Sequence, residues 1–425
     1  MLKKLFKKII IKILRFEAKI ILARFKPKII AISGTVGKTS AKEAIALVLG
    51  SEFNIRKSEK SYNSEFGVPL TVIGAKTGWN SLLKWLGVMR KGLKVFLLEM
   101  DYPEYLILEM GVDAPGDMER MMAWIKPDIG VITAFGSIPV HVERFKEPED
   151  LMKEKWKLME ILKDDDIAVL NKDDKMIASY GKKLKIKTVT FGFSESADLY
   201  ASNYKINSDG IVFKISYGGS IVPIKLNMVF GRQNVYTAMT AISVGLYCGI
   251  NLIKCVTAVS KMKPVSGRLN LLEGINNSLI FDDTYNSSPL AVEVAVETLS
   301  EYPAKRRIAV LGDMKELGKF SQSEHERIGE MLRAKDVWFL FAVGKEAKYF
   351  AEGARKSGFD TAKIFEFDNA VEAGEAVKQI IQEGDLILVK GSQSARMEKA
   401  VEKIMAHPEN KETFLVRQEE EWKNK

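Results

Sequence analysis

The segment at residues 32–40, ISGTVGKTS, constrains the fold of this 425-residue chain more than any other stretch. It follows the apolar run 29–32 and opens a stretch of helical periodicity, which predicts a strand, a tight turn and a helix in that order. Small residues in such a turn let backbone N–H groups surround a phosphate at the helix N-terminus. Lys38 would then reach the outer phosphates, and the Thr39 hydroxyl would bind magnesium.

The loop lacks one glycine of the general phosphate-binding template. That template has a glycine five residues before Gly37, where this chain carries Ile32. A Gly-Lys-Thr triplet is common by chance, but its place between a strand and a helix favours nucleotide binding over a structural turn.

Beyond the loop, strand-like apolar runs alternate with helical stretches, as is typical of α/β proteins with largely parallel sheets. Residues 262–267 have the composition of a linker, and the alternation that follows has the rhythm of a Rossmann-like fold. The predicted fold is therefore α/β, with a central phosphate-loop ATPase domain, a mainly parallel sheet and a Rossmann-like C-terminal domain. The expected divisions are a basic amphipathic helix at 1–28, an ATP-binding domain at 29–265 and a C-terminal domain at 266–425.

The net charge of +9 comes from one segment. Residues 1–28 hold ten Lys and Arg against the single acid Glu17, and the remaining chain is formally neutral. The basic balance therefore does not indicate a nucleic-acid partner. Only Cys248 and Cys255 occur, which argues against a disulfide framework and favours the cytoplasm.

Within residues 1–28, six apolar side chains follow a helical three-four spacing with lysines on the opposite face. They are Leu2, Phe6, Ile9, Ile13, Phe16 and Ile20. The charges that interrupt the run exclude a bilayer-spanning helix, and the segment lacks a cleavage site of the signal-peptide type. Two interpretations stay open: a helix peripheral on anionic lipid at the inner face of the membrane, or a helix docked on its own ATPase domain.

Nine motifs, in order along the chain, resemble the Mur ligase family, and most closely the branch that adds a dipeptide to a muramoyl tripeptide. They are the phosphate loop at 34–39, NSEFGVPLT at 63–71, EMG at 109–111, LNKDD at 170–174, GRQNVY at 231–236, SGRL at 266–269, DDTYN at 282–286, LGDM at 311–314 and KGS at 390–392. The resemblance implies an ATP-dependent, ADP-forming ligase that joins a carboxylate to an amine through an acyl phosphate.

The resemblance also implies roles for individual residues. ATP would be bound by Gly34, Thr35, Gly37, Lys38, Thr39, Ser40, Asn234, Arg268, Asp283 and Asn286. Thr39 and Glu109 would hold Mg²⁺ at the phosphates, and His141 and a carbamylated Lys155 would hold a second ion. Lys38, His141 and Lys155 form the expected catalytic set. Lys390, Ser392 and Arg396 would bind the incoming amine substrate.

Each assignment has a structural alternative. Taken alone, Glu109 is an ordinary acid at the end of a strand. The alternative for His141 is an ordinary loop histidine, because its loop is about two residues longer than is usual in the family. Lys153 and Lys157 lie two residues before and two residues after Lys155 and are alternative positions for the carbamate. Asn234 also reads as a helix cap, Asn286 as part of a turn, and the three amine-site residues as a loop followed by a helix.

The acceptor is where the chain departs from the family pattern. Only about 33 residues precede Gly34, too few for the family's N-terminal UDP-sugar-binding domain. A small-molecule or lipid-linked cell-wall (peptidoglycan) precursor is therefore the expected partner. The alternatives are a folylpolyglutamate- or cyanophycin-type ligase acting on another acceptor, and a non-catalytic nucleotide-binding partner subunit. The presence of Lys38, Glu109, His141 and Lys155 together favours an enzyme.

Overall fold

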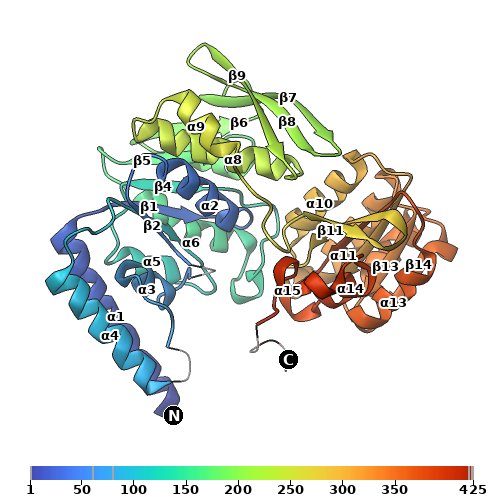
Figure 1. Cartoon of the computed structure of the whole chain (residues 1–425), viewed down its shortest axis with the longest axis horizontal. Coiled ribbons are helices and arrows are strands. Elements are labelled where there is room, and N and C mark those ends of the chain that lie inside the picture. The colour runs from blue at the N-terminus through green and yellow to red at the C-terminus, as the bar shows by residue number, and fades with distance from the viewer. Residues whose placement is uncertain (1, 60–61, 79–80, 420–421, 423–425) are drawn as a thin grey trace.

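The computed structural model describes residues 2–59, 62–78, 81–419 and 422, and it contains two sheets that lie side by side (Figure 1). The first has nine strands in the order β2-β3-β1-β4-β5-β6-β7-β8-β9. Its strands are β1 Lys28–Ser33, β2 Ile55–Lys57, β3 Tyr105–Glu109, β4 Ile129–Ile132, β5 Ile167–Asn171, β6 Lys187–Gly192, β7 Leu199–Asn207, β8 Gly210–Tyr217 and β9 Ser220–Asn227. Pairing is parallel from β2 to β7 and antiparallel from β7 to β9.

Helices cover both faces of this sheet, which is why its central strands are buried and mostly apolar, with polar residues at their ends. The helices of this half are α1 Leu2–Phe25, α2 Lys38–Leu49, α3 Gly67–Ile73, α4 Leu82–Leu98, α5 Asp117–Met122, α6 Pro148–Glu160, α7 Lys175–Gly181, α8 Arg232–Tyr247 and α9 Leu252–Val259. One core joins the sheet to α1, α3, α4, α5 and α6, and the other joins it to α2, α8 and α9.

The second sheet has six strands in the order β10-β11-β15-β12-β13-β14, all parallel except the edge strand β10. Its strands are β10 Asn270–Gly274, β11 Ser278–Asp283, β12 Arg306–Gly312, β13 Phe339–Val343, β14 Ile364–Phe367 and β15 Asp385–Lys390. The helices of this half are α10 Pro289–Glu301, α11 Ser321–Ala334, α12 Lys348–Lys356, α13 Ala370–Ile380, α14 Glu398–Ile404 and α15 Lys411–Phe414. The predicted fold class is thereby confirmed.

The N-terminal helix α1 packs on the body through a side that includes residues outside the six-residue apolar stripe. Ile10, Leu14 and Ile21 are buried in the core shared with α3 and α4. Of the six apolar residues noted in the sequence, Phe16 is 63% exposed and Ile9 is 47% exposed. Helix α1 therefore carries two apolar stripes at helical spacing, one buried against the body and one partly exposed. The side chains of Leu2 and Phe6 lie outside the described part of the structure.

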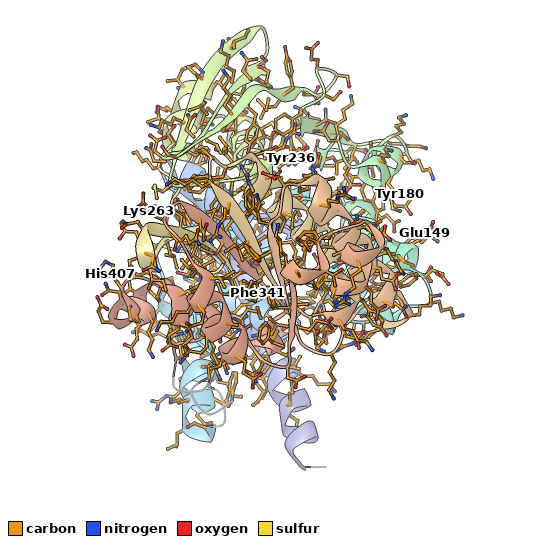
Figure 2. The ribbon with its side chains drawn as sticks, turned by 90° about the vertical axis from the view of Figure 1, so that its right-hand side faces the viewer. Glu149, Tyr180, Tyr236, Lys263, Phe341 and His407 are labelled. Carbon is orange, nitrogen blue, oxygen red and sulfur yellow. The ribbon has the colours of Figure 1, made fainter. Side chains whose placement is uncertain are left out.

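Both α1 and α4 extend beyond the body of the molecule, side by side, in two views at right angles (Figures 1 and 2). Within the residues that the structure describes, no helix is long and apolar enough to cross a membrane.

Candidate active site

The phosphate loop joins β1 to α2 as the sequence predicts. Gly37 has φ 87° and Gly34 has φ 136°, backbone conformations that side chains with a Cβ rarely adopt. A Cβ on Gly34 would also overlap the Thr133 hydroxyl at the end of β4. Lys38 Nζ donates to the carbonyl oxygens of Gly34 (2.8 Å) and Thr35 (3.1 Å), so the lysine lies across the mouth of the loop. Burial lowers the pKa of Lys38, and Glu109 opposes that shift.

Glu109 lies at the carboxyl end of β3, beside the start of α2. The residue is 2% exposed, and its Oε2 accepts a hydrogen bond from Thr39 Oγ1 at 3.1 Å. A hydroxyl and a carboxylate side by side form an all-oxygen donor set, which fits Mg²⁺. Among the described residues, no group of three or more His, Cys, Asp or Glu could hold a metal by itself. That is compatible with Mg²⁺, which usually keeps waters and substrate phosphates as ligands.

Two residues that the sequence analysis did not assign complete the surroundings of Glu109. Asn63 Nδ2 donates to Glu109 Oε1 at 3.3 Å, and Lys42 Nζ lies 3.8 Å from Oε2. Lys42 is fully buried one helical turn after Lys38, and burial lowers its pKa while Glu109 and Glu43 oppose the shift. The four-residue spacing between the two lysines, on the same face of α2, was the signal for Lys42.

His141 lies between the two sheets in a left-handed backbone conformation, with φ 69°. Its Nε2 is 3.4 Å from Asp113 Oδ1. Its Nδ1 is 2.7 Å from Glu316 Oε2, although the approach lacks hydrogen-bond geometry. Burial lowers the pKa of His141, and the two acids oppose that effect. Asp113 follows the EMG motif closely in sequence, whereas Glu316 comes from the second half of the chain and carries no sequence signal.

The three lysines of α6 differ in their surroundings. Lys153 lies 3.8 Å from Asp150 on the helix surface, and the partly exposed Lys157 lies 2.9 Å from the buried Glu154, so both are engaged in ion pairs. Lys155 is instead 3% exposed. Burial, together with the charge of Lys38, lowers the pKa of Lys155 to about 7. Of the three, only Lys155 has the environment of a reactive amine.

The ends of β11 and β15 contribute a third group of polar residues. Lys390 is buried at the end of β15, with its Nζ 2.7 Å from Asp283 Oδ2 and 2.9 Å from the Asn286 carbonyl. Arg268 reaches from the second half of the chain to the phosphate loop, where its Nη2 donates to Thr39 Oγ1 at 3.3 Å. The Arg268 guanidinium also lies over the Tyr285 ring.

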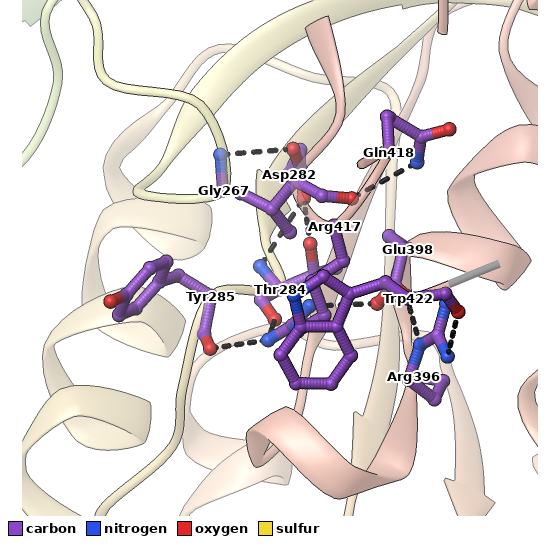
Figure 3. A network of polar contacts seen from close by, with 10 residues as sticks. Gly267, Asp282, Thr284, Tyr285, Arg396, Glu398, Arg417, Gln418 and Trp422 are labelled. Carbon is purple, nitrogen blue, oxygen red and sulfur yellow. Dashed lines mark hydrogen bonds and ion pairs between the residues drawn. The ribbon is translucent and has the colours of Figure 1, made fainter. Parts of the chain in front are cut away.

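Arg396 and the C-terminal tail form a separate polar network (Figure 3). Arg396 Nε donates to Glu398, and its Nη1 donates to the Trp422 carbonyl at 3.1 Å. Arg417 of the tail pairs with Glu398 at 2.8 Å and donates to the carbonyls of Thr284 and Tyr285. The tail is thereby fastened beside the strand that carries Asp283.

A cavity of about 560 Å³ lies between the two sheets and collects most of the predicted site. Its lining includes Thr35, Gly37, Lys38, Thr39, Ser40, Glu109, His141, Asn234, Arg268, Asp283, Asn286, Lys390 and Ser392. Gly34, Lys155 and Arg396 are predicted site residues that do not line it. A neighbouring cavity of about 1420 Å³ shares Thr39, Asn234 and Arg268 with it. Asn234 Nδ2 donates to the Phe230 carbonyl at 2.7 Å, and Ser392 Oγ accepts from the Lys315 amide at 2.8 Å.

Family models match both halves of the chain. A model described as the Mur ligase middle domain matches residues 88–245, and one described as the Mur ligase, glutamate ligase domain matches residues 267–393. Among curated relatives, the UDP-N-acetylmuramoyl-tripeptide–D-alanyl-D-alanine ligase of Bacillus subtilis is 27% identical over 394 residues, which is 92% of this chain and 79% of the relative. The enzyme of that name from Escherichia coli is 27% identical over 380 residues, covering 88% and 76%.

Solved structures share the fold. The MurF ligase of Thermotoga maritima in complex with ADP has a TM-score of 0.77 at 24% identity, covering 92% of this chain and 83% of that one. Folylpolyglutamate synthase of Mycobacterium tuberculosis has a TM-score of 0.64 at 15% identity, covering 91% and 94%. At these identities the likeness concerns the fold alone.

A phosphate loop on one sheet, facing lysine, arginine and carboxylate groups on another, defines an ATP-dependent ligase that needs both halves of the molecule. The two domain matches and the relatives agree with that class. The chain belongs to the Mur ligase family. It is an ATP-dependent, ADP-forming ligase that makes a carbon–nitrogen bond, as the sequence predicts.

Proposed function

We propose that this ligase extends the peptide of a peptidoglycan-type precursor, adding an amino acid or a dipeptide such as D-alanyl-D-alanine. Support comes from the relatives, whose names state that reaction and most of whose length the chain covers. The observation that carries the proposal is a cavity lined both by Lys38, at the start of α2, and by Arg268 and Lys390 of the second half of the chain. Three cations suit a reaction that brings ATP and a carboxylate together.

In the proposed reaction, an acceptor carboxylate oxygen attacks the γ-phosphorus of ATP, and ADP leaves. The amine then attacks the acyl carbon of the acyl phosphate, phosphate leaves with the C–O electrons, and the amine proton passes to solvent. Lys38 and the N–H groups of the loop hold the transferred phosphoryl group. Thr39 and Glu109 would hold Mg²⁺, which when bound neutralises phosphate charge.

We further propose that Lys155 carries a carbamate. Its pKa of about 7 leaves much of the amine neutral at physiological pH, and the neutral amine is the form that attacks CO₂. The new N–C bond releases a proton and turns a buried cation into an anion. The charge of Lys38 lowers the pKa of Lys155, and the charge of Lys155 lowers the pKa of His141. The anion would therefore lie near the groups proposed for a second magnesium ion.

Lys390, Ser392 and Arg396 are proposed to bind the incoming amine substrate. Lys390 and Ser392 line the cavity, which supports the proposal for these two. Arg396 is already engaged by Glu398 and Trp422, so its contribution requires those partners to exchange.

The divisions at 1–28, 29–265 and 266–425 are kept as the proposed domains, with the cytoplasmic side of the membrane as the proposed location. The acceptor would be a small UDP-linked or lipid-linked precursor.

ADP release tests the proposed function directly. The purified chain is given ATP, a muramoyl tripeptide in UDP-linked or lipid-linked form, and D-alanyl-D-alanine or L-glutamate, with Lys38→Ala as the blank. We expect ADP release only when a muramoyl acceptor and an amine are both present, with a product heavier by the added residue or dipeptide. Turnover with a folate acceptor and glutamate instead would overturn the proposal.

A further inference from the structure

Helix α4 presents an unusual surface for a helix of an α/β protein. Its buried side is a narrow stripe at Trp85, Val88, Gly92 and Val95, and most of the remaining circumference is exposed. Leu83 is 80% exposed, and Leu86, Leu93 and Leu97 are each more than half exposed. Spacings of three, seven and four residues place these four leucines on one side of the helix. Contiguous apolar surface of this kind marks an interaction site.

The charges of α4 select among possible partners. Lys84, Lys91 and Lys94 lie beside the leucine stripe and Arg90 lies within it, all four exposed. The sequence of α4 contains no acidic residue. The exposed side of the neighbouring α1 repeats the pattern, because Ile9 and Phe16 alternate with lysines there. Leucines flanked by a basic stripe complement the headgroups and acyl boundary of an anionic bilayer.

The position of the two helices allows such contact. They project together from the body, away from the second sheet, so a flat surface can approach them (Figures 1 and 2). The 17 residues of α4 are too short and too charged to cross the bilayer, which leaves binding in the plane of the interface.

We propose that the α1–α4 pair is a membrane-binding surface for anionic lipid, and that the leucine stripe of α4 supplies its inserted face. This goes beyond a membrane role for residues 1–28 alone, because the buried side of α1 holds the pair together while α4 makes the principal lipid contact. The inference does not depend on which acceptor the ligase uses.

Vesicle flotation of the full-length protein, without ATP or substrate, tests the proposal. Phosphatidylcholine vesicles with added phosphatidylglycerol should bind the protein, phosphatidylcholine alone should bind it weakly, and salt should reduce binding. Leu86→Gln/Leu93→Gln/Leu97→Gln should lower partitioning at least about tenfold. The matched control is Ile221→Gln/Ile253→Gln, which removes two equally exposed apolar side chains elsewhere and should bind as wild type. Lys84→Gln/Arg90→Gln/Lys94→Gln should lose about fivefold per residue, equivalent to roughly 1 kcal/mol each.

Melting temperature and ADP release of each variant show that it is folded. Equal binding by the leucine variant and wild type overturns the proposal, and so does a wild-type protein that ignores anionic vesicles. A third outcome would also overturn it: wild type sediments as a dimer, the leucine variant sediments as a monomer, and neither binds vesicles. The stripe would then be assigned to contact with a second copy of the chain. A wild-type protein that binds anionic vesicles but has no ligase activity would count against the proposed function alone.

Discussion

At the scale of single residues, the structure separates side chains that the sequence left equivalent. Lys153, Lys155 and Lys157 occur in one lysine-rich run, and only burial distinguishes the middle one. The motif at residues 34–39 could be predicted because it is local. The contact between His141 and Glu316 could not, since it depends on how the two sheets meet.

Lys155→Ala should lower kcat about 100-fold or more, because a positioned anion in a water-poor site is removed. Short carboxylates such as acetate should restore part of the activity by occupying the vacated space. The measurement is ADP release with and without acetate. Lys153→Ala, whose lysine only pairs with Asp150 on the surface, is the matched control and should stay within twofold of wild type. An inactive Lys153→Ala beside a normal Lys155→Ala would contradict the assignment.

Gly34→Ala should abolish ATP binding, measured by isothermal titration. Alanine at φ 136° is strained by about 1–3 kcal/mol, and its Cβ would overlap the Thr133 hydroxyl and push the loop from its position. Gly87→Ala on α4 is the control, because a Cβ there meets nothing within 4 Å and alanine favours a helix. Unchanged ATP affinity in Gly34→Ala would rule out the loop as the phosphate site.

At the scale of elements, strands were predictable because their apolar runs are short and distinct, and turns were predictable because glycine marks them. The hairpin of β8 and β9 turns at Gly218 and Gly219, both with positive φ, a conformation that glycine adopts readily. The orientation of helix α1 could not be predicted in this way. Two apolar stripes compete on it, and only the position of α4, which no local pattern gives, decides which stripe is buried.

The packing of α1 on α4 predicts a pH dependence of stability. Glu17 faces Gly92 of α4, its Oε2 has no hydrogen-bond partner among the described residues, and burial raises its pKa from 4.5 to about 7. Between these values the folded state holds a proton that the unfolded state releases. Stability contributed by this site is therefore greatest below about pH 4.5, falls as the pH rises through about 7, and then levels off.

Glu17→Gln should remove that dependence. Its melting temperature should match wild type near pH 5 and exceed it near pH 8, as measured by circular dichroism. Glu383→Gln, which replaces a largely exposed acid, is the control and should follow wild type at both pH values. The opposite result would be a wild-type protein that becomes more stable than Glu17→Gln as the pH rises to alkaline values. That result would show that the carboxylate is not buried as described.

At the scale of the whole molecule, the active site exists only where the two sheets meet. The loop around residues 315–319 contacts the loop around residues 141–147. Glu316 lies 2.7 Å from His141 Nδ1 and 3.9 Å from Arg144 Nη2, and Lys319 lies 2.9 Å from Glu147. These contacts join elements that lie far apart in the sequence. The sequence motifs therefore assign roles within each half but do not show which residues hold the two halves together.

The two contacts differ in burial, and that difference gives the last prediction. Lys319 and Glu147 are both about 60% exposed, so their ion pair is screened by water and contributes little. Glu316 instead reaches His141, which is 25% exposed and faces the cavity. Glu316→Ala should therefore favour a more open arrangement and lower kcat/KM about tenfold, because misplaced reacting groups lose rate steeply. Small-angle scattering should show a larger radius of gyration. Lys319→Ala should change both quantities little, and equal effects of the two variants would mean that Glu316 has no special part in closing the site.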